Sequence, residues 1–327
     1  MTMNIPNYSL NIDLSAYSFL VTGGAGFIGS HLVEYLLQHG AKRVRVLDNF
    51  STGSRSNTDL FALDYRYELI EGDIRQPDTC HIACRDIDFV LHQAALGSVP
   101  RSVKDPIATN EVNVSGFVNM LHACRLADIK RVVYASSSAV YGDEPTLPKI
   151  ESRIGKPLSP YAVSKLANEI YADVFMRCYG IEIIGLRYFN VFGERQSPEG
   201  LYAAVIPLFI EGLRQQKEVF INGDGEQSRD FTYVANAVQA NIKALFAPVE
   251  ATGKVYNIAA GQRYTINQLY NVIANLLGST QKPIHRAVRE GDIPHSLANI
   301  DLARHWLNYE PQIALYEGLE KMLKTFT

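Results

Sequence analysis

A tyrosine and a lysine four positions apart, Tyr161 and Lys165, have the residue types and spacing for acid–base chemistry in this 327-residue chain. They follow Pro160 at the predicted start of a helix, and a spacing of four places both side chains on one helix face. A nearby ammonium favours the phenolate and lowers the pKa of a tyrosine. Such a tyrosine can take and return a hydroxyl proton near neutral pH. A tyrosine and a lysine with this spacing are more often an ordinary surface pair. The neighbouring motifs therefore decide whether this pair is catalytic.

Ser137 supplies a third group for the same chemistry. It lies in the run Ser136-Ser137-Ser138, directly after the apolar segment 131–135, which is predicted to be a strand. A hydroxyl there can bridge Tyr161 and the reacting oxygen of a substrate, which makes a short proton relay.

A glycine-rich turn provides the context for these residues. The apolar run 19–21 leads into Gly23-x-x-Gly26-x-x-Gly29, and an amphipathic segment follows. This order predicts a strand, a tight turn and a helix. Residues without Cβ let the backbone approach a pyrophosphate, and the helix N-terminus offers free N–H groups to phosphates. The turn therefore predicts a dinucleotide site.

Asp48 indicates which dinucleotide binds. It ends the predicted strand 43–47, about 20 residues past the glycine turn, where a carboxylate can accept both ribose hydroxyls of an adenosine. The same charge repels a 2′-phosphate, so NAD is favoured over NADP, and a positively charged nicotinamide would further favour the Tyr161 phenolate. The alternative is an exposed aspartate at a strand end. Asp73, in the turn after the next strand, could meet the adenine amino group or be a simple turn residue.

Strands and helices alternate over the first 190 residues, which predicts an α/β fold with a Rossmann-type, doubly wound parallel sheet. Ligands bind such sheets at the carboxyl ends of the strands. His92, at the end of one strand, is interpreted as a packed strand residue. Further strands are predicted at 67–70, 89–92, 131–135 and 181–186, and long helices at about 107–127 and 161–179.

The alternation weakens beyond Gly193, which predicts a smaller substrate-binding α/β lobe. We expect residues 1–17 to form a short extension on the surface. Residues 18–193 would bind NAD, with return segments at about 233–261, and residues 194–232 and 262–327 would bind the substrate.

Composition excludes several classes of partner. The net charge is −3 with no dense basic run, so neither nucleic acid nor an anionic membrane is expected as a partner. No long apolar segment predicts a membrane helix, and the N-terminus lacks the pattern of a signal peptide. The four cysteines lack paired metal-type spacing, so we predict no metal site and expect free thiols in a cytoplasmic protein.

Seven motifs together resemble the extended short-chain dehydrogenase/reductases, and within them the nucleotide-sugar 4-epimerases, in particular those acting on UDP-N-acetylglucosamine (UDP-GlcNAc). They cover nearly the whole chain. The motifs are Thr22-Gly-Gly-Ala-Gly-Phe-Ile-Gly29, Leu47-Asp-Asn-Phe-Ser-Thr-Gly53, Ser136-Ser-Ser-Ala-Val-Tyr-Gly142, Tyr161-x-x-x-Lys165, Arg187-Tyr-Phe-Asn-Val-Phe-Gly193, Gly223-Asp-Gly-x-x-x-Arg-Asp-Phe231 and Arg289-Glu-Gly-Asp292.

The resemblance implies an isomerase that uses a resident NAD. Tyr161 would remove the proton of the sugar 4-hydroxyl, a transient 4-keto sugar would turn over in the pocket, and reduction from its opposite face would invert C4. Similar dehydratases and decarboxylases carry an acidic residue just after the catalytic Ser/Thr. Ser138 and Ala139 follow Ser137 here, which disfavours elimination.

The resemblance also implies two sets of binding residues. In the nucleotide-sugar set, Arg229 and Arg289 would hold the pyrophosphate and Asp292 the uridine ribose. The cofactor residues would be Gly23, Gly26, Phe27, Ile28, Gly29, Asp48, Asn49, Ser51, Thr52, Gly53, Asp73, Ile74, Gln93, Ala94, Ala95, Asn113, Tyr161, Lys165 and Tyr188. The substrate residues would be Gly97, Ser98, Ser137, Ser138, Tyr161, Asn190, Ala204, Val205, Asn222, Arg229, Arg289, Asp292 and Ser296.

Ser296 bears on which sugar fits, since it matches a position where glucose/galactose-restricted relatives tend to carry a tyrosine. A small residue leaves room for a 2-N-acetyl group, although Ser296 could merely be small. Gly97 would leave further space, and Ser98 could hydrogen-bond the substituent. The expectation is interconversion of UDP-GlcNAc and UDP-N-acetylgalactosamine (UDP-GalNAc), with possible UDP-Glc/UDP-Gal exchange.

Two other functions stay open from the sequence. One is 4-epimerisation of UDP-N-acetylglucosaminuronate, which needs a polar or basic partner for the 6-carboxylate that the sequence does not locate. The other is a catalytically silent NAD-binding scaffold, which the intact Ser137, Tyr161 and Lys165 argue against. The helices at about 107–127 and 161–179 resemble those of a four-helix dimer interface, so a homodimer is expected.

Overall fold

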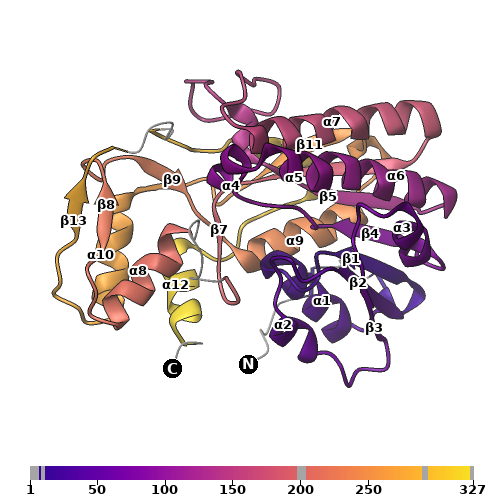
Figure 1. Ribbon diagram of the computed structural model, residues 1–327, viewed down its shortest axis with the longest axis horizontal. Helices are drawn as coiled ribbons and strands as arrows, with labels where there is room; N and C mark the ends of the chain where they lie inside the picture. Colours follow the sequence, from indigo (N-terminus) through magenta and orange to yellow (C-terminus); the bar gives the residue numbers. More distant parts are fainter. Residues whose placement is uncertain (1–6, 9–11, 197–203, 289–293, 325–327) are drawn as a thin grey trace.

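A seven-stranded parallel sheet forms the centre of the molecule in the computed structural model, which describes residues 7–8, 12–196, 204–288 and 294–324 (Figure 1). Its strand order is β11-β6-β5-β4-β1-β2-β3, and all neighbours pair in parallel. The predicted α/β class and Rossmann-type sheet are confirmed. The strands are β1 (Ser18–Thr22), β2 (Arg43–Asp48), β3 (Tyr67–Glu71), β4 (Phe89–His92), β5 (Arg131–Ser137), β6 (Glu182–Tyr188) and β11 (Lys254–Ile258).

Helices cover both faces of this sheet, which is why its central strands are apolar along their whole length. All five residues of β1 are buried. One face packs against α1 (Phe27–Gln38), α9 (Val234–Leu245) and α11 (Asp301–Leu307). The other packs against α3 (Pro77–Cys84), α6 (Gly116–Leu126) and α7 (Pro160–Tyr179).

The strand order reverses between β1 and β4, which pair directly although β2 and β3 lie between them in the sequence. A reversal of this kind opens a crevice at the carboxyl ends of the strands. The glycine turn after β1, the Gln93-Ala94-Ala95 segment after β4 and the serine run at the end of β5 all reach this edge.

The predicted long helix at about 107–127 is built in three parts. It comprises α5 (Pro106–Asn110), a five-residue π-helical turn (Glu111–Ser115) and α6. Such π turns often lie beside functional sites. This turn points Asn113 inward, where its amide bonds the backbone of Leu96 and the Ser164 hydroxyl.

Helix α7 starts at an N-cap. The Ser159 hydroxyl accepts a hydrogen bond from the N–H of Ala162 at 3.1 Å, and Pro160 takes the first helical position. Gly180 ends the helix with a left-handed φ of +72°. This start places Tyr161 in the first turn, at the carboxyl edge of the sheet, and Lys165 one turn further on.

A smaller lobe has its own apolar core. It contains α8 (Val205–Arg214), α10 (Ile266–Leu276) and α12 (Leu315–Lys324), and β13 (Ile284–Arg286) pairs in parallel with β8 (Phe220–Asn222). β12 (Arg263–Thr265) runs antiparallel to β9 (Ser228–Asp230). The link to the sheet is the short pair of β7 (Val191–Phe192) and β10 (Thr232–Tyr233). Figure 1 shows this lobe beside the carboxyl edge of the sheet.

The expectation that residues 1–17 lie on the surface is wrong for part of that segment. Tyr8 and Leu14 are buried in the core that also holds α1. The Tyr8 ring stacks on Tyr35 with 5.7 Å between centroids, and its N–H donates to the Tyr35 hydroxyl at 2.6 Å. Both side chains are largely apolar, so their removal from water stabilises them in the core.

Among the described residues, no helix combines the length and the apolar character needed to cross a lipid bilayer.

Candidate active site

Two cavities meet at the carboxyl edge of the sheet. The first, of about 540 Å³, runs from the glycine turn to Tyr161 and Lys165. The second, of about 580 Å³, lies between the first turn of α7, Arg229 and Ser296. Ser137, Tyr161 and Asn190 line both cavities. A group bound in one cavity can therefore meet a group bound in the other at these side chains.

Ser137, Tyr161 and Lys165 converge as the sequence predicts. Tyr161 and Lys165 share one face of α7, with the Lys165 Nζ 6.0 Å from the centre of the Tyr161 ring. Nζ donates to the Ala135 carbonyl on β5 at 2.8 Å. A hydrogen bond joins Tyr161 to Ser137. The end of β5 and the start of α7 thus hold the three groups together.

Burial is the main influence on the pKa of Tyr161 among the protein's own groups. Burial raises the pKa of Tyr161, and the hydrogen bond with Ser137 offsets only part of this rise. Burial also lowers the pKa of Lys165 to about 8, although the Glu169 carboxylate opposes that change. The predicted lowering of the Tyr161 pKa by the Lys165 ammonium and a positively charged nicotinamide together stays a prediction.

The glycine turn requires glycine at two of its positions. Gly23 has a φ of +70°, and a Cβ there would lie 2.7 Å from the N atom of Ala94. A Cβ on Gly29 would lie 2.1 Å from the Gly23 carbonyl oxygen. Any side chain at either position would push the first turn of α1 away from the sheet, so the glycines keep the helix N-terminus against the cavity.

Asp48 closes the same turn from β2. One carboxylate oxygen accepts the Ala25 N–H at 2.9 Å and the other accepts the Phe50 N–H at 2.8 Å. Burial raises the pKa of Asp48, and these hydrogen bonds work against the rise. Asp48 is thus a buried residue on the cavity wall, and the alternative of an exposed strand-end aspartate is wrong.

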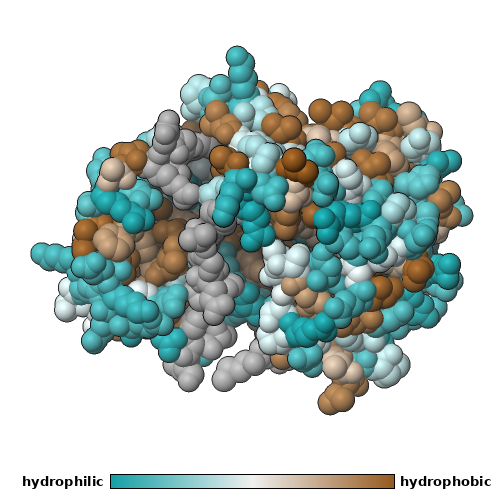
Figure 2. All heavy atoms as spheres, viewed as in Figure 1, coloured by the Kyte–Doolittle hydropathy of each residue, from teal (hydrophilic) through white to brown (hydrophobic). Residues whose placement is uncertain are grey.

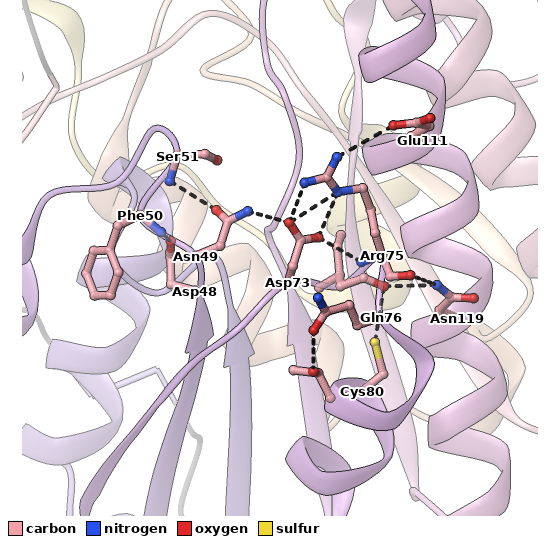
Figure 3. A network of polar contacts seen from close by, with 12 residues as sticks. Asp48, Asn49, Phe50, Ser51, Asp73, Arg75, Gln76, Cys80, Glu111 and Asn119 are labelled. Atoms are coloured by element: carbon pink, nitrogen blue, oxygen red, sulfur yellow. Dashed lines mark hydrogen bonds and ion pairs between the residues drawn. The ribbon is translucent and has the colours of Figure 1, made fainter.

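Asp73 lies at the centre of a polar network at the far end of the first cavity (Figure 3). Arg75 holds its carboxylate in a two-pronged ion pair, with Nη2 to Oδ2 at 2.7 Å, and Asn49 donates to it at 2.8 Å. The Arg75 guanidinium lowers the pKa of Asp73 to about 2. Asp73 is therefore an ionised acceptor that also fixes the loop after β2.

Most other predicted cofactor residues line the first cavity. Two do not, since Gly53 packs against Ala25 and Asn113 bonds Leu96 behind the wall. Tyr188 lines it and accepts a hydrogen bond from Asn241 at 2.7 Å. The further residues that line it are Gly26, Phe27, Ile28, Asn49, Ser51, Thr52, Ile74, Gln93, Ala94 and Ala95.

The predicted substrate residues divide differently. Those that line the second cavity are Ser137, Ser138, Tyr161, Asn190, Arg229 and Ser296. Gly97 and Ser98 line the first cavity instead, and the Ser98 hydroxyl accepts the Arg101 N–H at 3.2 Å as the cap of α4 (Val99–Lys104).

Three of the described substrate residues are not on either wall. Ala204 and Val205 begin α8, and Asn222 accepts a hydrogen bond from Arg286 at 2.8 Å. Arg289 and Asp292 lie outside the described residues.

Several wall residues were not predicted from the sequence. Val99, Pro100 and Val103 of α4 form an apolar side of the second cavity, and Lys149 lines it from the loop before α7. Lys149 is buried and donates through Nζ to the Glu144 carbonyl. Its backbone N–H donates to the Leu297 carbonyl at 2.7 Å, which brings it beside Ser296. No spacing rule indicates such a contact between distant loops.

His92 is a packed strand residue, as interpreted from the sequence. Its Nδ1 lies 2.9 Å from the Thr22 hydroxyl, and burial lowers its pKa to about 3. It is therefore neutral at physiological pH and does not line either cavity.

Comparison with known proteins gives one consistent family. The profile of the NAD dependent epimerase/dehydratase family matches residues 19–259. The UDP-glucose 4-epimerase of Mycolicibacterium smegmatis is 36% identical over 309 residues, which cover 94% of this chain and 97% of that one. The chain belongs to the NAD-dependent epimerase/dehydratase family. The resemblance to nucleotide-sugar 4-epimerases is thereby confirmed, and NAD is the cofactor.

Two solved structures of this family are similar over nearly their whole length. The UDP-N-acetylglucosamine 4-epimerase from Methanobrevibacter ruminantium, in complex with UDP-N-acetylmuramic acid, has a TM-score of 0.90 at 39% identity, covering 95% of this chain and 98% of that one. The UDP-glucose 4-epimerase of Thermotoga maritima with UDP-glucose has a TM-score of 0.89 at 34% identity, covering 94% and 98%.

The first cavity fits NAD on its own features. The glycine turn leaves space that a Cβ would fill, the buried Asp48 carboxylate lies on the cavity wall, and Lys165 and Tyr161 line the other end. Among the described residues, no group of three or more His, Cys, Asp or Glu side chains could hold a metal ion.

Proposed function

We propose that this epimerase interconverts UDP-GlcNAc and UDP-GalNAc by inverting C4 of the sugar. The observation that carries the proposal is the position of Ser137 and Tyr161, where the two cavities join. NAD would occupy the first cavity and the nucleotide sugar the second. The reacting C4–O group then lies beside Tyr161, which is the arrangement that oxidation and re-reduction at one carbon requires.

Tyr161 and Ser137 would move the proton. Tyr161 takes the proton of the 4-hydroxyl while the carbon is oxidised, and Ser137 passes it along the hydrogen bond that the two side chains share. The chemistry that bound NAD supplies is reversible acceptance of a hydride. Reduction of the transient 4-keto sugar from its opposite face then inverts C4, and Tyr161 returns a proton to the sugar oxygen.

Lys165 would hold the cofactor ribose and keep a positive charge near Tyr161. Its Nζ makes one hydrogen bond to Ala135 and still lines the first cavity. Since burial raises the pKa of Tyr161, positive charge near the phenol is what the reaction needs.

The shape of the second cavity supports an N-acetylated sugar. Ser296 is small, and Val99, Pro100 and Val103 offer an apolar wall for an acetyl methyl group. Arg229 on the same cavity suits a pyrophosphate, because a guanidinium binds phosphate oxygens with paired N–H groups. The similar M. ruminantium structure is named as a UDP-GlcNAc 4-epimerase.

The direct test is proton NMR of purified protein with UDP-GlcNAc, followed through the anomeric signals. UDP-GalNAc should form until a constant ratio is reached, at a rate at least comparable to UDP-Glc/UDP-Gal exchange. Absence of UDP-GalNAc beside rapid UDP-Glc/UDP-Gal exchange would overturn the N-acetyl assignment.

A second candidate substrate is UDP-N-acetylglucosaminuronate, which Lys149 favours. A 6-carboxylate needs a cationic or polar partner, and Lys149 supplies a buried ammonium on the second cavity beside Ser296. Only its bond to the Glu144 carbonyl is present among the described contacts of Nζ, so two of its N–H groups remain available to a carboxylate.

Replacing Lys149 by methionine separates the two substrates. If the carboxylate is recognised there, K149M lowers kcat/KM for the uronate by roughly tenfold or more, since a charged hydrogen bond is lost. Turnover of UDP-GlcNAc should change little. K156M, in the same loop but off the cavity, is the control. Equal losses on both substrates would exclude a carboxylate role for Lys149.

We also propose that the two lobes bind different ligands. Residues 18–193 and about 233–261 would bind NAD, and residues 194–232 and 262–327 the nucleotide sugar. The core cluster of the smaller lobe and the position of Arg229 support this division. A cytoplasmic location is proposed from the thiols, because Cys80, Cys84, Cys124 and Cys178 are all unpaired.

A homodimer is proposed from exposed apolar residues on adjacent helices. α4, α5 and α7 contact one another, and each leaves large apolar side chains in water. Figure 2 shows apolar residues gathered on the side of the molecule where these helices run. The residues are Val103, Ile107, Val163, Ile170 and Tyr171. A patch of this kind on one face is typical of an interface between subunits.

A further inference from the structure

A buried carboxylate lies directly behind the proposed catalytic groups. Glu169 of α7 accepts two hydrogen bonds from Arg187 of β6, from Nε at 2.9 Å and from Nη2 at 2.7 Å. The Ser136 hydroxyl of β5 donates to the same carboxylate at 2.5 Å. The Glu169 and Arg187 side chains are 9% and 3% exposed. None of the predicted site motifs assigns Glu169 a role.

Glu169 and Lys165 are held by consecutive residues of one strand. Lys165 lies one helical turn before Glu169 and bonds the carbonyl of Ala135, and Glu169 bonds the hydroxyl of Ser136. Ser137 is the next residue of the strand. Helix α7 is thus fastened to the end of β5 at two adjacent points, and Ser137 follows immediately.

Three charged side chains lie close to this point. The Arg187 guanidinium pairs with the Glu169 carboxylate, and the same carboxylate acts through its charge on the Lys165 ammonium. Three other titratable groups face them and are neutral, because burial lowers the pKa of His92 to about 3 and raises the pKa of Tyr134 and of Tyr161.

Two further groups touch Arg187 from its other side. The Tyr141 ring lies 4.9 Å from the guanidinium, and burial raises the Tyr141 pKa to about 12. The Glu151 carbonyl accepts from Arg187 at 3.0 Å, while the Glu151 carboxylate accepts the Asn257 N–H at 2.9 Å. Neither contacts Lys165 among the described residues, so Glu169 is the anion that bears on its charge.

We propose that Glu169 is a positioning residue that fastens Lys165 and the Ser136–Ser137 strand end together and balances the charge of Arg187, so that Lys165 stays an ammonium during turnover. The proposal rests on the role proposed above for Lys165. Without the Glu169 charge, the buried Lys165 ammonium would lose the anion that favours it, and Lys165 would give up its proton more readily.

Removing the charge of Glu169 and removing the charge of Arg187 should shift the pH dependence of kcat in opposite directions. For the wild type we expect kcat to fall above about pH 8, because burial lowers the pKa of Lys165 to about 8. E169Q should move this alkaline fall to lower pH by about one unit, because the Glu169 charge that raises the pKa of Lys165 is lost. R187Q should move it to higher pH, because Glu169 then faces Lys165 alone. The double variant E169Q/R187Q should return towards the wild-type profile.

A matched control exists on the same two strands. Arg131 and Glu182 pair at the amino ends of β5 and β6, with Nη2 to Oε2 at 2.5 Å. E182Q removes an equivalent carboxylate far from the carboxyl edge, so it should leave the pH of the alkaline fall unchanged. A structural role alone for Glu169 predicts that E169Q and E182Q both lower Tm and leave that pH where it is.

A second measurement needs no turnover. The pKa of Lys165 in the folded protein is below its unfolded value, so between the two values the unfolded chain binds more protons and stability rises with pH. This rise begins near pH 8 in the wild type and should begin at lower pH in E169Q. Thermal unfolding of the cofactor-free protein against pH measures it.

The outcomes separate this inference from the proposed function. If the wild type converts no UDP-sugar, the proposed function fails and this inference fails with it. If the wild type is active and the alkaline fall moves in neither E169Q nor R187Q, the proposed function stands and the role of Glu169 is refuted. If E169Q does not fold, R187Q is the variant that tests the proposal. An R187Q pH profile of kcat with the same alkaline fall as the wild type would overturn it.

Discussion

At the scale of single residues, Tyr161 is the group on which the proposed chemistry depends. It stands where both cavities meet, its phenol is hydrogen-bonded to Ser137, and burial makes it a weak acid. A group with these properties holds its proton until substrate and cofactor supply the charge that favours its release.

Replacing Tyr161 by phenylalanine should therefore remove catalysis without removing the cofactor. We expect kcat to fall by about 10²–10⁴-fold, the usual contribution of a positioned acid–base group. Bound NAD, measured after acid release from purified protein, should stay near the wild-type amount. Tyr179, exposed near the end of the same helix, gives the control Y179F. Unchanged turnover in Y161F would refute the assigned role.

Ser296 should decide how much room the sugar has. A tyrosine there would fill part of the second cavity, beside the apolar wall of α4. S296Y should lower kcat/KM for UDP-GlcNAc by roughly 100-fold through overpacking, with a much smaller loss for UDP-Glc. S296A keeps the space and should retain UDP-GlcNAc turnover. Equal losses on both sugars in S296Y would show that this position does not select the 2-substituent.

At the residue scale, the sequence predicts side-chain positions correctly where a motif and its place on a strand or helix agree. Ser137, Tyr161 and Lys165 converge because each lies at the end of a strand or in the first turns of a helix, and such ends meet at one edge. Lys149 was missed because loops far apart in the sequence place it there. The burial that raises the Tyr161 pKa could not be predicted from the sequence, because burial is a property of the packed molecule.

At the scale of elements, the turn between β1 and α1 fixes the first cavity. G29A should weaken NAD binding by about 100-fold or more, since the new methyl group would meet the Gly23 carbonyl oxygen. S30A changes the next residue of the same helix without adding bulk, so it should keep the cofactor. Titration of cofactor-free protein with NAD, followed by tyrosine or tryptophan fluorescence, measures both. Equal affinity in G29A and the wild type would contradict this account of the turn.

Strands and helices followed their sequence patterns closely. The predicted helix at about 161–179 is α7 (Pro160–Tyr179), and the predicted strand 43–47 is β2 (Arg43–Asp48). The pattern did not reveal the π-helical turn at Glu111–Ser115, because an inserted residue shifts the helix without changing its apolar character. Nor did it reveal that Ser98 serves as the cap of α4.

At the scale of the whole molecule, the apolar side chains of α4, α5 and α7 predict assembly. I170E should shift the protein from dimer to monomer, because Ile170 is 59% exposed at the centre of α7 and a charge there would be buried in the interface. L60E, at a comparably exposed leucine on the far side of the sheet, should leave the mass unchanged. Light scattering after size exclusion distinguishes them, and a monomeric wild type would refute the dimer.

The N-terminal segment shows that composition alone does not predict whether a segment packs into the core. Its polar, Asn-rich sequence predicts a surface extension, yet Tyr8 and Leu14 pack into the main core. Two well-placed apolar side chains suffice to bury part of a segment whose average character is polar.

The measurement that tests the central claim most directly is proton NMR of UDP-GlcNAc turnover in deuterated water. The account predicts that UDP-GalNAc forms and that its C4 keeps ordinary hydrogen, because the hydrogen leaves and returns within the closed site and only the hydroxyl proton exchanges with solvent. Failure to form UDP-GalNAc, or deuterium at C4 of the product, would contradict it.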